Sequence, residues 1–349
     1  MIRARTLISI AVALALVLAL MPTVALAAEE GQSTGSFQAG NVDPTVTAVE
    51  LWTTGGTPVS TTAMDPQVEY NVKVTVSDAN NLSDLATVDV TIFYDADGTY
   101  AAGEETGATG SQTRVILTWT NGGGPPPWTI DPVTSATNSW TIESASCVEP
   151  TLTTTPGTFE FHFKPGKVAT ETVGAAKWHI YAEADDGEGG TPGSETLENL
   201  AMNWYGGVTV TTGTVDWGVV SPGMDFAEGD PSEEGSISVT YIANGAYDEQ
   251  VAASSSWSGA PSGTATLNED GTPGENEFSL KADDTGTLPA VGLVKDKDTT
   301  GYITVDDSND TLTSESGDVT TNTLWLKLGT PFTGATYTGT IWYKILDGS

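Results

Sequence analysis

The chain has 349 residues, more than one domain usually holds, and its 12 Lys and Arg against 46 Asp and Glu give a formal net charge of −34. So acidic a chain repels phosphate backbones and anionic membrane surfaces, and we therefore expect no nucleic-acid partner. Its single cysteine, Cys147, excludes a disulfide framework, a zinc finger and an iron–sulfur site. A hydrophobic content of 38% with ten Trp is too high for a disordered chain.

The first residues have the pattern of an export signal. Arg3 and Arg5 precede an apolar run, Leu7–Leu20, and the small-residue site Ala25-Leu26-Ala27 follows. This order predicts a signal peptide over residues 1–27, because the run is short for a membrane span and a cleavage site follows it. The alternative is an uncleaved membrane anchor. We expect a secreted protein, extracellular or at the cell surface, with no transmembrane segment after cleavage.

The rest of the chain alternates apolar and polar residues in short runs. Examples are Tyr70–Val76, Val88–Tyr94, Phe159–Phe163 and Trp178–Ala182, with Gly, Pro, Asn and Asp between such runs. A period of two residues with one apolar face predicts strands that pack one side onto a core. The fold class is therefore predicted as all-β, and only Glu195–Trp204 has the spacing of a short helix.

The distribution of these runs predicts two domains. Residues 28–43 are polar and suggest a flexible N-terminal tail, and a boundary is expected at Tyr205-Gly206-Gly207. We predict two antiparallel β-sandwiches in tandem, over residues 44–205 and 206–349. Within the second, the acidic stretch Asp283–Asp318 predicts long loops with an edge strand around Tyr302–Val305.

Two runs in each half carry a resemblance to known modules. In the first half, Tyr70–Asp78 and Trp178–Ala182 look like an Ig- or PKD-like module. In the second half, Trp217–Gly223 near the start and Thr336–Tyr343 at the end resemble β-sandwich modules of prokaryotic secreted, surface-layer-type proteins. The resemblance implies an Ig-like fold and a location at the surface; it implies no ligand and no functional residue.

The sequence does not indicate a catalytic site. Its Gly-x-Ser-x-Gly spacing at Gly31–Gly35 lies in the polar N-terminal tail and does not follow a strand, and there is no His-Glu-x-x-His. The bases of the usual kind are His162 and His179, both at outward positions of alternating runs. Two surface histidines are the simpler interpretation. We therefore expect no catalytic residue and no enzymatic activity.

Calcium is the one cofactor that the sequence suggests. Carboxylates gather in turns that follow or precede strands, and extracellular calcium is abundant enough for weak sites. Loops at one end of a sandwich would bring such residues together. Solvated acidic turns are the alternative, because Asp-Gly is ordinary turn chemistry. The candidate ligands are Asp78, Asp84, Asp95, Asp97, Glu104, Asp185 and Asp186.

Two tryptophans are candidates for an interface or a ligand. With Leu324, Leu326 and Leu328 facing the core, Trp325 and Lys327 are expected to face outward. The same alternation places Trp342 and Lys344 outward on the last strand, and a hairpin over 329–336 would bring the two pairs together on one face. Exposed tryptophans bind partner proteins or stack on sugars, unless another element covers them.

These observations favour a non-enzymatic structural protein of the cell surface or extracellular matrix. We expect it to assemble with itself or with other surface proteins as a surface-layer-like or fibre subunit, through sheet edges, exposed aromatics and calcium. The alternative is a carbohydrate-binding or adhesin module that takes polysaccharide with Trp325 and Trp342.

Overall fold

The computed structural model describes residues 34–38, 40–59, 62–211, 213–227, 234–309 and 311–349. The predicted signal peptide lies outside these residues. Residues 1–40 and 41–349 form separate units, and residues 34–38 of the first have no regular structure. The second unit is built of strands, with one short 3₁₀ turn at Leu82–Asp84, which confirms the all-β class. None of the described helical residues forms a segment able to cross a membrane.

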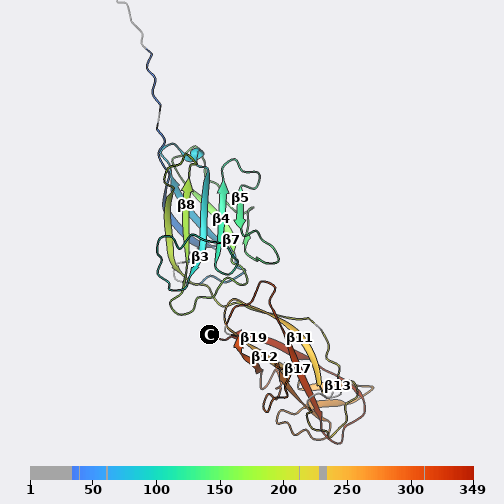
Figure 1. Cartoon of the computed structure of the whole chain (residues 1–349). Helices are drawn as coiled ribbons and strands as arrows, with labels where there is room; N and C mark the ends of the chain where they lie inside the picture. The colour runs from blue at the N-terminus through green and yellow to red at the C-terminus, as the bar shows by residue number, and fades with distance from the viewer. Residues whose placement is uncertain (1–33, 39, 60–61, 212, 228–233, 310) are drawn as a thin grey trace, which may run out of the picture. The chain divides into compact units, whose positions relative to one another are not determined.

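The first half of the second unit contains two antiparallel sheets, with strand orders β1-β2-β7-β6 and β5-β4-β3-β8-β9. Figure 1 shows β5, β4, β3 and β8 side by side. The strands are β1 (Thr45–Thr53), β2 (Tyr70–Ser77), β3 (Thr87–Asp95), β4 (Arg114–Thr120), β5 (Trp128–Asp131), β6 (Thr141–Ile142), β7 (Pro156–Lys164), β8 (Lys177–Asp185) and β9 (Gly193–Leu200).

The core of this half follows the predicted alternation. On β7, Phe159, Phe161 and Phe163 are completely buried, and they pair with Val74, Val72 and Tyr70 of β2. The opposite sheet adds Trp119 and Trp178, and residues of both sheets belong to one hydrophobic cluster. The two sheets therefore pack as a sandwich, as strands with one apolar face require.

The second half contains a seven-stranded sheet, β10-β11-β17-β15-β14-β13-β18, and a three-stranded sheet, β16-β12-β19. The strands are β10 (Gly206–Val210), β11 (Glu234–Ala243), β12 (Tyr247–Ala253), β13 (Ser256–Ala260), β14 (Thr264–Leu267), β15 (Glu277–Asp283), β16 (Ile303–Asn309), β17 (Asp318–Leu328), β18 (Thr336–Thr338) and β19 (Ile341–Asp347). The edge strand expected around Tyr302–Val305 is confirmed as β16.

Each half has its own hydrophobic cluster. The first cluster draws on residues between Val46 and Met202, and the second on residues between Trp217 and Ile345. Strands β1–β9 pair only with one another, as do β10–β19. The domain boundary at 205/206 and the Ig-like topology remain predictions, because residues 41–349 form one unit by their contacts.

The helix predicted over Glu195–Trp204 was wrong. Gly193–Leu200 is strand β9, which pairs with β8 through Glu195↔Ala182 and Leu197↔Ile180. The free edge of β8 offered the segment a ladder of backbone hydrogen bonds, and this tertiary pairing overrode a weak local helical spacing.

The core of the second half includes an ionisable group. Glu249 of β12 is completely buried, and one of its carboxylate oxygens accepts a hydrogen bond from Thr320 Oγ1 at 2.7 Å. Burial raises the pKa of Glu249 to about 7, and the nearby Asp306 carboxylate adds to the rise while the Thr320 bond opposes it. The core therefore holds a carboxyl group that prefers its neutral form.

We predict that Glu249→Gln removes a pH dependence of stability. Between the ordinary pKa of 4.5 and about 7, the folded protein binds this proton more tightly than the unfolded chain, so stability falls as the pH rises through that window. The free energy of unfolding lost across this window is roughly 3 kcal/mol. Urea unfolding at pH 5 and pH 8 measures it: the variant should gain stability relative to wild type at pH 8 only. Glu198→Gln, at an exposed position, is the control, and equal pH slopes for wild type and Glu249→Gln would contradict the assignment.

Candidate functional site

The seven predicted calcium ligands lie at two opposite ends of one sheet. Asp185 ends β8 and pairs with Thr87, the first residue of β3, whereas Asp95 ends β3 and pairs with Lys177. Nine residues of strand separate these ends, roughly 25 Å at the rise of a β-strand. The expectation that loops at one end gather all seven was therefore wrong.

At the Asp95 end, the carboxylates serve the turns that contain them. Asp95 and Asp97 accept hydrogen bonds from the backbone N–H groups of Asp97 and Thr99 at 3.1 and 3.0 Å, and Glu104 accepts one from Ala101 at 2.8 Å. These are the local bonds by which acidic residues stabilise turns. Asp97 and Glu104 therefore have the geometry of the simpler interpretation, solvated acidic turns. The Asp95 side chain is only 9% exposed, and its Oδ2, 3.5 Å from His179 Nε2, has no hydrogen-bond partner among the described residues.

At the opposite end, Asp78 is buried and only partly satisfied. Its side chain is 1% exposed, and Oδ1 accepts a hydrogen bond from the Asn80 N–H at 2.7 Å, but Oδ2 has no hydrogen-bond partner among the described residues. Burial raises the pKa of Asp78, and the charges of Asp84 and Asp186 raise it further. Three of the predicted ligands, Asp78, Asp84 and Asp186, therefore act on one another electrostatically.

The neighbouring residues at this end are hydrogen-bonded. Asp185 and Asp186 accept backbone N–H groups of Gly187 and Glu188 at 2.8 and 2.9 Å. Asn41 donates from Nδ2 to Asp186 Oδ2 at 2.7 Å, which holds the pKa of Asp186 below its usual range. Within the described residues, no three acidic, His or Cys side chains form a metal-binding group.

Trp325 is buried, and the prediction that it faces solvent was wrong. It lies on β17 at 0% exposure, paired with Lys281 of β15 and Glu234 of β11. Trp325 and Trp342 also lie in different sheets, because β17 belongs to the seven-stranded sheet and β19 to the three-stranded one. The two residues therefore do not form the predicted aromatic face.

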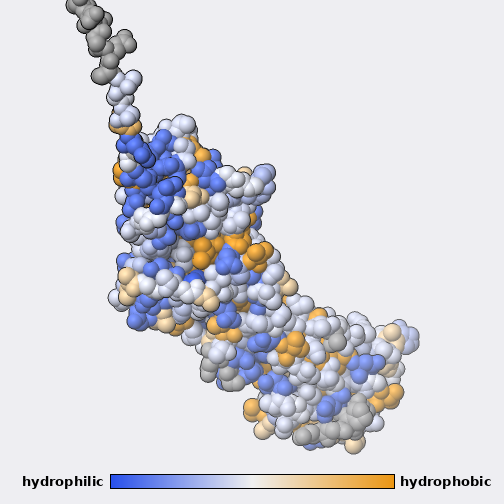
Figure 2. Space-filling model, turned by 45° about the horizontal axis from the view of Figure 1, so that its top comes forward, coloured by the Kyte–Doolittle hydropathy of each residue, from blue (hydrophilic) through white to orange (hydrophobic). Residues whose placement is uncertain are grey.

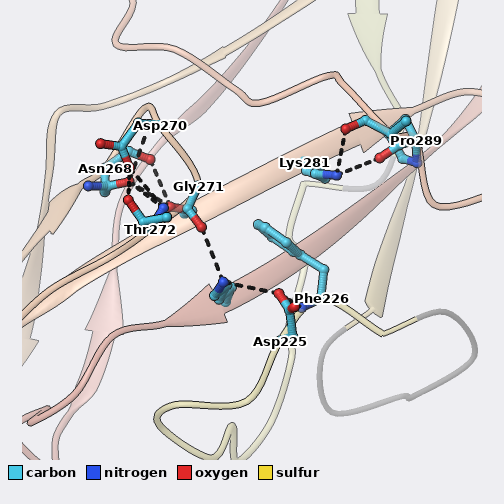
Figure 3. A network of polar contacts seen from close by, with 11 residues as sticks. Asp225, Phe226, Asn268, Asp270, Gly271, Thr272, Lys281 and Pro289 are labelled. Atoms are coloured by element: carbon cyan, nitrogen blue, oxygen red, sulfur yellow. Dashed lines mark hydrogen bonds and ion pairs between the residues drawn. The ribbon is translucent and has the colours of Figure 1, made fainter.

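A segment distant in sequence explains why this outer face is closed (Figure 3). The Phe226 ring lies 5.3 Å from Lys281 Nζ and 5.6 Å from Lys327 Nζ. Lys327 Nζ also forms an ion pair with Asp225 Oδ1 at 3.0 Å and donates to the Gly271 carbonyl at 3.2 Å. The pair Asp225-Phe226 thus lies over the lysines that flank Trp325. The polar contacts of Lys327 are made within the second half of the chain.

The residues predicted outward on β19 are half-buried and capped by neighbours. Lys297 Nζ lies 5.2 Å from the Trp342 ring, and Lys344 Nζ lies 5.4 Å from the Tyr302 ring. Cation–π contacts of this kind cover the aromatic faces that a sugar would use. The geometry therefore gives no support to a sugar-binding pair of tryptophans.

The outward positions predicted for the histidines need one correction. His179 is completely buried between Phe93 and Tyr100, with Nε2 3.5 Å from Asp95 Oδ2. His162 is half-buried, and its Nδ1 lies 2.9 Å from Glu69 Oε1. The loop that contains Tyr100 covers the outer face of the sheet at His179, and the alternation along β8 does not reveal such a cover.

The surface seen in Figure 2 is mostly hydrophilic or neutral, with hydrophobic residues in a few patches. Among the exposed apolar residues are Val208 and Val210 of β10, at 39% and 41% exposure. They pair with Tyr241 and Val239, which are buried, so these valines face the core side of a strand that its neighbours leave partly uncovered.

The edge strand β10 is distinguished by its lack of charge. Among the described strands, β11 is the one that hydrogen-bonds to β10, and β19 of the other sheet lies near it. The sequence of β10 is Gly-Gly-Val-Thr-Val. The other described edge strands of five or more residues all carry charged residues: Glu50 in β1, Glu195 and Glu198 in β9, Asp306 and Asp307 in β16, and Lys344 and Asp347 in β19. We did not predict this edge; an uncharged β-branched run in so acidic a chain was the available signal.

Comparisons with known proteins give weak likenesses. No family model and no curated protein matches the chain. A DUF4466 family protein from Parabacteroides merdae is 10% identical, with 82% of this chain and 99% of that chain covered and a TM-score of 0.25. The C-terminal domains of two antigen I/II proteins are similar at this level too.

The first of these is BspA of Streptococcus agalactiae, 11% identical, with 86% and 95% of the two chains covered and a TM-score of 0.21. The second is AspA of Streptococcus pyogenes, 10% identical, with 89% and 97% covered and a TM-score of 0.22. Such identities and TM-scores are too low to carry an inference about function.

Proposed function

We propose that this chain is an extracellular, non-enzymatic structural protein whose copies associate through the free edge of β10. The export pattern of residues 1–27 supports the location. The high acidity supports it as well, because an exported chain of this charge stays soluble at the surface. The observation that supports the proposed assembly is the uncharged edge of β10.

Free sheet edges are templates for pairing with another chain, and proteins that remain single protect them with charge, proline or short length. Here β9, β16 and β19 carry charged residues, and β5, β6 and β18 have four residues or fewer. β10 has neither charge nor proline, and it is longer than these three by one residue or more. A second β10 running antiparallel to the first would extend the seven-stranded sheet across a two-fold axis.

Charge on this edge should abolish association. We predict that Val208→Lys converts oligomer into monomer, because two lysines would meet across the pairing, whereas Val133→Lys, at an exposed loop valine, leaves the mass unchanged. Light scattering coupled to chromatography measures the mass. Pairing through one short strand buries little area, so loading concentrations of about 100 μM and above are needed.

Two results would contradict the edge assignment. Wild type could remain monomeric at every concentration, or Val208→Lys and Val133→Lys could leave the oligomer equally intact. In the second case the subunits would associate through another surface.

We also propose that calcium stabilises the Asp78 end of the first sandwich. The buried carboxylate oxygen without a partner and the adjoining Asp84 and Asp186 charges supply the negative potential that a divalent cation requires. Because Asp78, Asp84 and Asp186 do not converge as a metal-binding group of three among the described residues, the remaining ligands would be carbonyl, amide or water oxygens.

The variant Asp78→Asn tests whether calcium binds at this end of the sandwich. In EDTA the variant should melt at a higher temperature than wild type near neutral pH, because a carboxyl whose pKa is raised in the fold destabilises it when ionised. Calcium should reverse the order, by about 2.7 kcal/mol of wild-type stabilisation at 100 times its Kd. Asp97→Asn at the other end of the sheet is the control. Equal melting shifts of wild type and Asp78→Asn with calcium would refute the site.

A further inference from the structure

We propose that the second sandwich binds an uncharged, lipid-like molecule in a cavity between its two sheets. The cavity has a volume of about 830 Å³. Its floor is formed by Trp257, Phe278 and Leu326 of the large sheet and by Tyr343 of β19. This inference is independent of the β10 edge and of calcium.

Two irregular segments form the walls of the cavity. One follows β10 and includes Val215, Val219 and Val220; the other is the stretch around Phe332 and Tyr337, between β17 and β19. Val219 is 91% exposed. Val215, Val220, Phe332 and Tyr337 also pack against the core of the second half, so the walls continue its apolar surface. A volume of this size is typical of small-molecule sites.

Two buried donors belong to residues that line the cavity. Trp257 and Tyr343 are 7% and 8% exposed. The Trp257 Nε1–H and the Tyr343 hydroxyl have no hydrogen-bond partner among the described residues, and both atoms are closed off from the open space of the cavity. A buried donor without an acceptor is costly, so a ligand oxygen that reaches either donor through a small movement of its ring would satisfy it.

The indole edge of Trp257 lies against a glycine of the cavity wall. A Cβ on Gly339 would stand 2.0 and 2.2 Å from Trp257 Cδ1 and Nε1, so a larger residue there would displace the ring. The glycine therefore lets the chain pass close to the donor edge of the indole.

The charge of the lining selects the ligand class. No Lys or Arg is among the lining residues of the described chain, and the one charged residue is Asp216. An anion such as a fatty acid would meet a like charge and no cation, whereas a neutral ester or ether oxygen can accept from Trp257 and Tyr343 without that penalty. The chemistry therefore fits a neutral lipid, with an apolar chain and acceptor oxygens.

Gly334 provides a way to close the cavity without disturbing the fold. It lines the cavity, and a Cβ added to it meets no atom within 4 Å. Gly334→Trp should therefore fold and occupy the space. Gly55→Trp is the matched control, because Gly55 lies in an exposed turn of the first half and its added Cβ meets only Thr53 Oγ1, at 3.7 Å.

The test is titration of the full exported chain with Nile red, a neutral apolar dye with a carbonyl oxygen, followed by competition. We expect one dye per chain, with binding lost in Gly334→Trp and retained in Gly55→Trp. Trp257→Phe and Tyr343→Phe should each weaken binding roughly two- to tenfold, the effect of losing one hydrogen bond. Monolaurin should displace the dye at a concentration at least about tenfold lower than dodecanoate does, and Asp216→Asn should narrow that difference.

Three results would overturn the inference. Dye binding could be absent, it could be equal in Gly334→Trp and Gly55→Trp, or dodecanoate could compete as well as monolaurin. A change of mass in Gly334→Trp without dye binding in wild type would assign the cavity to a segment of a second copy instead.

Discussion

The unequal size of the two sheets in the second sandwich determines most of what is distinctive in this chain. Seven strands on one side face three on the other. The smaller sheet cannot cover the inner face of the larger one, so the irregular segment after β10 supplies the missing cover. It places Trp217 in the core, where the indole donates to the Leu324 carbonyl at 3.2 Å. This segment covers the inner face only in part. The cavity and the half-exposed valines of β10 lie where the cover is missing.

Alternation along the chain predicted the inner faces well, because it reports a local property: which side of a strand avoids water. Tyr70, Val72, Val74 and Val76 are all buried on β2, as expected. The outer faces could not be predicted in the same way. His179 and Trp325 are buried because segments containing Tyr100 and Phe226 lie over them, and no pattern within β8 or β17 encodes those distant covers.

At the candidate sites too, the sequence predicted local features and missed those that depend on distant segments. The sequence identified acidic turns at strand ends, and Asp78, Asp84 and Asp186 do influence one another. It could not tell which end of the sheet each turn occupies, because that depends on the pairing of β3 with β8. The cavity was beyond prediction for a further reason: its lining comes from strands of both sheets and from two irregular segments, and its polar feature is the absence of partners for Trp257 and Tyr343 among the described residues.

Charge placement links these features to the proposed assembly. Copies of a chain with 46 carboxylates repel one another, so association requires a surface from which charge is missing. β10 and the cavity wall beside it form such a surface: the strand is uncharged, and Asp216 is the one acidic residue of the described lining. Carboxylates elsewhere keep the remaining long edges from pairing. In the proposed assembly, acidity of this kind therefore directs association to one edge instead of opposing it everywhere.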